Sequence, residues 1–229
     1  MEYIKILNLI EENLEGEAHL DELAKKDQDP FKILISTILS ARTKDANTEE
    51  ATMKLFSKFK TPKQIAEADI EELEQLIYKA GFYRVKAARI KEVSKIIVEK
   101  YNGIVPEDFE SLKSLPGVGN KTANCVLVYA FKQPAIPVDV HVNRISNRLG
   151  WAKTTKPEET EETLKKILPK NQWIRVNRLF VRFGQEVCIP INPKCNSCPV
   201  NNLCPKDFSI EEREKSKRKK HHQSLKINH

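Results

Sequence analysis

Long apolar runs are missing from this sequence of 229 residues, although 40% of the residues are hydrophobic. A helix that crosses a bilayer needs about 18 or more consecutive apolar residues, so we expect a soluble protein with a packed core and no membrane contact. No apolar signal segment follows Met1. We therefore expect an intracellular protein, which would lie in the cytoplasm of a prokaryote.

Alternation of apolar and polar residues, the pattern of a β-strand, is also missing. Apolar residues instead recur every three or four positions, which predicts helices. The N-terminal stripe consists of Tyr3, Ile6, Leu7, Ile10 and Leu14. Asp29-Pro30 and Thr61-Pro62 are typical of an N-cap followed by the first helical residue. The predicted fold class is all-α.

Glycine is scarce, with seven residues in the chain. Gly81 and Gly103 follow two predicted helices, over 69–80 and 84–101, and we expect both glycines to be left-handed C-caps. Another helix should begin after Asp139, and a later apolar stripe predicts a helix that runs up to a cysteine-rich loop. That stripe consists of Trp173, Val176, Phe180 and Phe183.

Disulfides are not expected, because structural disulfides are rare inside cells. Four cysteines nevertheless lie close together, spaced C-x6-C-x2-C-x5-C: Cys188, Cys195, Cys198 and Cys204. Structural zinc usually joins two C-x2-C pairs across a longer insert, whereas here single cysteines flank one such pair. The spacing favours a 4Fe-4S cluster over zinc, and two disulfides are the third alternative. Cys125 lies on the apolar side of a predicted helix and is expected in the core.

The segment S-L-P-G-V-G-N-K-T-A-N begins at residue 114 and holds two of the seven glycines. A helix that ends near Leu115, a Gly-x-Gly turn and a helix that begins near Asn120 would form a helix-hairpin-helix. Its exposed backbone N–H groups suit a phosphate. The letters G-N-K-T are similar to the end of a nucleotide P-loop, but Asn120 replaces the second glycine and no strand precedes the loop. A purely structural tight turn is the other alternative.

Lys121 lies in the first turn of the second hairpin helix, where the positive end of the helix dipole lowers the pKa of an amine. A lysine there is suited to be a nucleophile, although most single lysines are solvated. Asp139 is expected to be an N-cap and also a carboxylate that stabilises cationic charge or assists proton transfer. His141 on the same turn is expected to be a polar or core residue.

The net charge of +7 favours a polyanionic partner, because lysine and arginine displace counterions from phosphates. Part of the excess lies in the run K-S-K-R-K-K at 215–220. This run is either a phosphate-binding arm or a solvated tail.

Three motifs together resemble the endonuclease III family of DNA glycosylases: L-P-G-V-G-N-K-T-A, V-D-V-H-V-N-R and the four-cysteine loop. The resemblance covers the chain from S-A-R-T-K-D at 40–45 through Cys204. It implies two helical domains, a six-helix barrel with the helix-hairpin-helix over 24–133 and a cluster domain made of 1–23 and 134–207. The basic tail over 208–229 is additional to the family pattern, and we expect it to be mobile.

The resemblance further implies a base excision repair DNA N-glycosylase with AP lyase activity. Lys121 would attack C1′ of a flipped nucleotide, release the base and nick the strand by β-elimination, while Asp139 stabilises the sugar. The two residues would meet across a cleft that holds the DNA. The substrates would be oxidised pyrimidines such as thymine glycol, and abasic sites, in double-stranded DNA bound by a monomer. The four cysteines would ligate a 4Fe-4S cluster.

The resemblance also implies DNA contacts. Phe82 would be an apolar wedge in the base stack, Arg42 would lie near the orphan base, and Lys194 would contact a phosphate beside the cluster. The hairpin contacts would be Pro116, Gly117, Val118, Gly119 and Asn120.

Two positions depart from the family pattern. Arg42 stands where many relatives have glutamine, and Phe82 replaces the more common leucine, so the substrate range stays open. A mismatch-specific glycosylase is one alternative, although such relatives typically lack a lysine at the position of Lys121. A non-catalytic iron-sulfur module for DNA binding or electron transfer is the other alternative.

Overall fold

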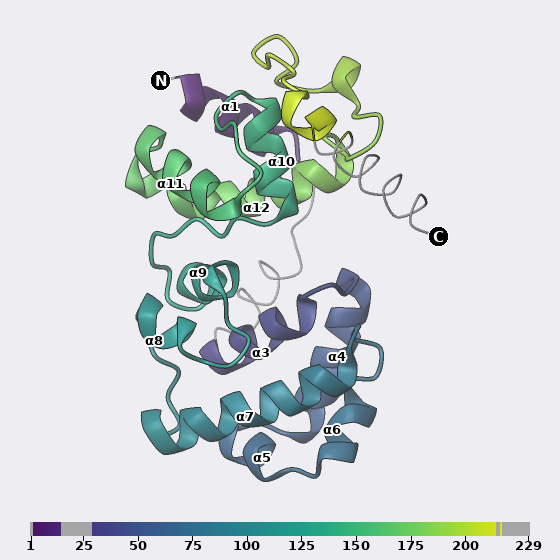
Figure 1. Cartoon of the computed structure of the whole chain (residues 1–229), viewed down its shortest axis with the longest axis vertical. Coiled ribbons are helices and arrows are strands. Elements are labelled where there is room, and N and C mark those ends of the chain that lie inside the picture. Colours follow the sequence, from purple (N-terminus) through teal and green to yellow (C-terminus); the bar gives the residue numbers. More distant parts are fainter. Residues whose placement is uncertain (1, 15–28, 214–215, 217–229) are drawn as a thin grey trace, which may run out of the picture. The chain divides into compact units, whose positions relative to one another are not determined.

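The computed structural model describes residues 2–14, 29–213 and 216, and these residues form helices and loops without a strand (Figure 1). The chain divides into two compact units, one made of residues 1–16 with 138–229 and the other of residues 17–137. The prediction of an all-α fold is confirmed. Among the described helices, none has the length and apolarity needed to cross a membrane.

The unit over 17–137 is built around α3 (Pro30–Ser40), which is buried on nearly all sides. A helix that is apolar all round belongs inside a domain, and α3 contacts α4, α7 and α9. The helices of this unit besides α3 are α4 (Asp45–Lys58), α5 (Pro62–Glu67), α6 (Ile70–Leu76), α7 (Tyr83–Tyr101), α8 (Phe109–Lys113) and α9 (Asn120–Tyr129).

Both predicted helix starts are confirmed. The Asp29 carboxylate accepts a hydrogen bond of 2.9 Å from the backbone N–H of Phe31, one residue after the proline at the first position of α3. Thr61 and Gln64 form a capping box at the start of α5, in which each side chain satisfies a backbone N–H of the other residue. These local signals fix where α3 and α5 begin.

One predicted C-cap is confirmed and the other is wrong. Gly103 follows α7 with a φ of +82°, in the left-handed region. Gly81 is not left-handed, since α6 ends at Leu76 and the next left-handed residue is Phe82, with a φ of 58°. Gly81 is needed for another reason: a Cβ there would lie 2.7 Å from the carbonyl oxygen of Arg42. The glycine permits a close approach of two loops.

The second unit contains α1 (Glu2–Glu12), α10 (Val140–Arg148), α11 (Pro157–Ile167), η1 (Lys170–Gln172), α12 (Trp173–Glu186) and η2 (Cys195–Ser197). Its N-terminal helix packs on α12. The Trp151 ring lies 5.3 Å edge-on from Tyr3 and 5.5 Å from Phe180. Arg175 of α12 also donates to Asn8 of α1 at 2.9 Å. Segments from the two ends of the sequence therefore share one core.

The start of the predicted tail needs correction. Residues 208–213 are not a free arm, because residues 209–213 are helical and both Phe208 and Glu211 contact Arg148 of α10. Arg148 is buried and requires an anionic partner, which Glu211 provides. Apart from Ser216, the basic run at 215–220 lies outside the described residues.

Candidate functional site

The hairpin between α8 and α9 exposes its backbone. Leu115 and Val118 are buried and hold the turn through a hydrogen bond of 3.1 Å from the Val118 N–H to the Leu115 carbonyl, whereas Gly117 and Gly119 are exposed. Gly119 is the N-cap of α9 and has no side chain that could cap it. The N-cap of α9 is thus exposed and has no side-chain cap, as a phosphate site at this hairpin would require.

Lys121 is half-buried in the first turn of α9, directly after Asn120. The first turn of α9 contains no acidic residue, so α9 itself does not offset the positive potential of its N-terminus. The sequence prediction of the local position is confirmed, because α9 begins at Asn120. An amine in this environment is suited to react as a nucleophile.

Two loops of the same unit lie side by side and carry Arg42 and Phe82. Both residues have left-handed backbones, with φ of 52° and 58°. Phe82 is 64% exposed, and the Arg42 guanidinium lies 5.9 Å from its ring centroid. The backbone N–H of Gly81 donates to the Thr43 hydroxyl at 3.0 Å. The loops therefore present a large apolar ring and a cation together on the surface.

A buried lysine holds these loops, and sequence reasoning missed it. Lys86 of α7 is 3% exposed, and its Nζ donates to the carbonyls of Leu39 at 2.6 Å and Ala41 at 2.7 Å and to the Thr43 hydroxyl at 2.7 Å. Burial lowers the pKa of Lys86 to about 8, and the positive charge of Arg89 adds to this effect. The ammonium group ties the C-terminal end of α3 to the loop that carries Arg42.

Asp139 is the N-cap of α10, as predicted. Its Oδ1 accepts hydrogen bonds from the N–H groups of His141 at 2.9 Å and Val142 at 2.8 Å. The other carboxylate oxygen has no hydrogen-bond partner among the residues that the structure describes. His141 Nδ1 lies 3.2 Å from Nη2 of Arg144, which also donates to the Gly184 carbonyl at 2.9 Å. His141 is thus part of the polar packing between α10 and α12.

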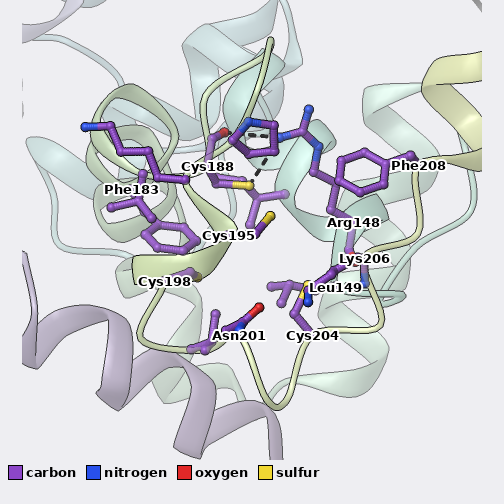
Figure 2. A pocket seen from close by; sticks show the side chains of 15 residues that line it. Arg148, Leu149, Phe183, Cys188, Cys195, Cys198, Asn201, Cys204, Lys206 and Phe208 are labelled. Carbon is purple, nitrogen blue, oxygen red and sulfur yellow. Dashed lines mark hydrogen bonds between the residues drawn. The ribbon is translucent and has the colours of Figure 1, made fainter.

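The four cysteines of the second unit line one pocket (Figure 2). Apolar side chains complete much of its wall, among them Leu149, Phe183, Val187, Val200 and Phe208. Within the described part of the chain, no three histidine, cysteine or carboxylate side chains are placed to bind a single metal ion. The four thiols line the same pocket, so the donors present there match a cluster with one cysteine for each iron.

The electrostatics of the pocket fit a cationic centre. Burial raises the pKa of the thiols of Cys198 and Cys204, and the neighbouring cysteines oppose their ionisation further. Four thiolates can therefore coexist here only with a compensating positive charge. Two sulfurs accept hydrogen bonds of 3.4 Å. Arg148 Nη1 donates to Cys188 Sγ, and the backbone N–H of Lys206 donates to Cys204 Sγ. The residues present fit an iron-sulfur cluster.

Arg148 is the second functional residue that sequence reasoning missed. Its guanidinium donates to the carbonyls of Ile189 at 2.8 Å and Pro190 at 3.0 Å, and it lies 4.9 Å from the Phe208 ring centroid. The two carbonyls belong to the loop between Cys188 and Cys195. Arg148 therefore fixes the path of the cysteine loop against α10.

The two remaining predicted residues lie in different surroundings. Lys194 is exposed at the rim of the cysteine pocket, and its backbone N–H donates to the Val187 carbonyl at 2.9 Å. Cys125 is fully buried in α9 of the other unit, which agrees with its predicted place in the core.

Comparison with known proteins assigns the family. A family model of the HhH-GPD superfamily of base excision DNA repair proteins matches residues 35–170. Endonuclease III of Thermotoga maritima is 56% identical over 179 residues, which are 78% of this chain and 84% of that protein. The chain belongs to the endonuclease III family. The prediction of the family is confirmed.

Solved structures of endonuclease III and of a related protein share this fold. A trapped endonuclease III–DNA covalent intermediate, described as an estranged-adenine complex, is 41% identical with a TM-score of 0.75 and covers 85% of this chain and 95% of its own. A thermostable thymine-DNA glycosylase is 25% identical with a TM-score of 0.78, and the match covers 91% of this chain and 94% of the glycosylase chain.

The HhH-GPD match includes the Arg42 and Phe82 loops, the hairpin with Lys121, and Asp139, and it ends before the four cysteines. The roles of these individual residues stay predictions. The structure places them in two units, with Lys121 in one and Asp139 in the other.

Proposed function

We propose that this protein is a base excision repair DNA N-glycosylase with AP lyase activity. It removes oxidised pyrimidines such as thymine glycol from double-stranded DNA and nicks abasic sites. The observation that carries the proposal is Lys121, half-buried in the first turn of α9 directly after an exposed, uncapped hairpin, in a chain of the endonuclease III family.

The hairpin binds the DNA backbone. A phosphate accepts hydrogen bonds from the open N–H groups at the start of α9 and is attracted by the helix dipole. The contact residues are Pro116, Gly117, Val118, Gly119 and Asn120. The net charge of +7 and the exposed Lys194 add attraction along the duplex.

Lys121 performs the chemistry on the sugar of the flipped nucleotide. Its neutral Nζ forms a bond to C1′ while the bond from C1′ to the base breaks, and the base leaves with its electron pair and a proton. The sugar ring then opens: the C1′–O4′ bond breaks, O4′ takes up a proton, and the nitrogen lone pair forms a Schiff base with C1′. This Schiff base acidifies C2′, loss of the C2′ proton breaks the C3′–O bond, and water finally releases the lysine. Extrusion of the nucleotide is required because C1′ and the base are otherwise enclosed in the stack.

Asp139 acts on the same sugar. One carboxylate oxygen is engaged with the N–H groups of His141 and Val142, which fixes the orientation of the side chain. The second oxygen stabilises positive charge on the sugar and accepts a proton from the Lys121 amine. The proposed reaction needs both side chains at one sugar.

The Arg42 and Phe82 loops keep the duplex open. An exposed apolar ring inserted between base steps fills the space that the flipped nucleotide leaves. Arg42 beside it hydrogen-bonds the orphan base. The hydrogen bonds of Lys86 and Gly81 to Thr43 fix the two loops relative to each other.

We further propose that Cys188, Cys195, Cys198 and Cys204 ligate a 4Fe-4S cluster. When bound, the cluster cross-links the cysteine loop and so holds Lys194 where it can contact a phosphate. The proposed reaction uses an amine and a carboxylate and requires no electron transfer.

A panel of duplex substrates tests the proposed function. Excision is measured on thymine glycol opposite adenine or guanine, on uracil, on 8-oxoguanine and on thymine opposite guanine, together with nicking of an abasic site. We expect the highest rates on thymine glycol and at the abasic site. The fold shared with a thymine-DNA glycosylase makes the mismatch enzyme the second candidate. Activity confined to the mismatch would favour that candidate, and binding without any cleavage would favour a non-catalytic module.

A further inference from the structure

Arg89 of α7 lies directly against the hairpin turn. A Cβ on Gly117 would lie 2.1 Å from both Cδ and Nε of Arg89 and 2.6 Å from its Cζ. These distances are far shorter than any real contact, so the arginine side chain occupies the space next to the Cα of the glycine. Gly117 also has a φ of +74°, which disfavours any other residue. The hairpin sequence thus makes room for a guanidinium.

This guanidinium has no anionic partner among the residues that the structure describes. Arg89 is half-buried, and among the described residues it forms no hydrogen bond or ion pair. One turn before it on α7 lies Lys86, another cation, whose ammonium group is already engaged with three oxygens. One turn after it lies Glu92, which is exposed and forms no ion pair with Arg89. Partial burial of an arginine beside a like charge is unfavourable unless an anion is bound. The surroundings of Arg89 are therefore prepared for an external anion.

The start of α9 supplies the second half of an anion site. Gly119 has no atom within 4 Å of the position that its Cβ would occupy, so the surface at the N-cap is open. The exposed N-cap of α9 and the guanidinium of Arg89 thus lie at the two glycines of the same Gly-x-Gly turn. Arginine presents paired N–H donors that match two oxygens of a phosphate.

We propose that Arg89 binds a backbone phosphate of the DNA beside the hairpin, and that Gly117 is required so that the guanidinium can reach it. This inference rests on the proposed DNA-repair function and adds a contact to those predicted from the sequence. A phosphate contact of this kind raises affinity for any duplex and carries no information on the lesion.

The experiment measures binding of the full chain to a duplex that contains a tetrahydrofuran abasic analogue, by fluorescence anisotropy over a series of salt concentrations. For Arg89→Gln we expect about tenfold weaker binding and a slope of log K against log salt that is shallower by about 1. Arg89→Lys keeps the charge and should keep the slope. Lys95→Gln is the matched control, since Lys95 is an exposed cation on α7 paired with Glu99 at 3.8 Å, and it should bind like the wild type.

A second measurement uses the wild-type protein, in case Arg89→Gln does not fold. Phenylglyoxal modifies accessible arginines, and mass spectrometry reports how far bound duplex protects Arg89. Protection supports the inference. Equal modification with and without DNA overturns it, as does an unchanged salt slope in a folded Arg89→Gln variant, which would show that the arginine only packs on the turn. If the wild type shows no salt-dependent binding, the proposed function fails together with this inference.

Discussion

Arg148 and Glu211 form a bidentate ion pair with two hydrogen bonds, 2.6 Å between Nε and Oε1 and 2.8 Å between Nη2 and Oε2. Burial lowers the pKa of the arginine, but hydrogen bonds to Glu211 and to the Cys188 sulfur outweigh this effect and raise the pKa above its ordinary value. The pair joins the segment after the last cysteine to α10. The cysteine loop is therefore held at both of its ends.

Glu211→Gln should destabilise the unit that carries the cysteines by about 2 kcal/mol, because it leaves a buried guanidinium with a weaker acceptor. Urea denaturation followed by circular dichroism measures this change. Glu212→Gln is the matched control, since Glu212 is exposed on the same helical segment. Equal stability of the two variants would contradict a structural role for the pair.

Phe82→Ala should slow excision of thymine glycol from duplex DNA at least about tenfold, while nicking of a preformed abasic site changes little. Excision requires the duplex to be held open around a flipped base, whereas an abasic site has no base to extrude. Single-turnover kinetics give the ratio of the rate of thymine glycol excision to the rate of abasic-site nicking. Tyr78→Ala removes another exposed aromatic ring of the same unit and should leave the ratio unchanged. Equal loss on both substrates would rule out the wedge.

Lys86 should make the stability of the protein depend on pH. The pKa of Lys86 is about 8 in the folded protein against an ordinary value of 10.5, so the unfolded chain binds its proton more tightly. Between these two values, rising pH removes the proton from the folded protein first and increases the free energy of unfolding by up to about 3 kcal/mol. Urea titrations of the wild type and of Lys86→Met from pH 7.5 to 10.5 measure the difference between their free energies of unfolding at each pH. Parallel pH profiles would contradict the lowered pKa.

The isolated protein should be yellow-brown, with absorbance near roughly 400 nm and about four irons per chain. Cys195→Ser should remove the colour and destabilise the unit that contains it. Cys125→Ala is the control, because Cys125 lies in the core of the other unit and should leave the colour intact. One zinc per chain in a colourless, active protein would overturn the cluster.

The elements that local rules control were predictable. Asp29 and Thr61 cap their helices through neighbouring N–H groups, and the turn before Asn120 ends one helix and begins the next, all within a few residues of sequence. The same holds for Asp139, whose capping of α10 involves only residues two and three positions on.

Long-range contacts were not predictable in the same way. The reason for Gly81 is the carbonyl of Arg42, which is 39 residues away in the sequence, so a local rule assigned the wrong conformation. Lys86 was missed because most lysines on helices are solvated. One signal could have indicated its burial: Lys86 continues the apolar stripe of Ile90, Val93 and Ile97 by one helical turn.

Arg148 was missed for the same physical reason. A charged residue at the end of a helix is usually solvated, and nothing near it in the sequence shows that Glu211 will reach it. The predicted mobile tail therefore began too early. Only the folded arrangement brings the buried cation and its carboxylate together.

Borohydride trapping on abasic DNA tests the central claim most directly. Wild-type protein mixed with a duplex that contains an abasic site and treated with borohydride should form a covalent adduct, and mass spectrometry of its digest should place the DNA on Lys121. Lys121→Ala should form no adduct yet bind the duplex, and Asp139→Asn should form it slowly. An adduct formed by Lys121→Ala at the wild-type rate would show that another amine is the nucleophile.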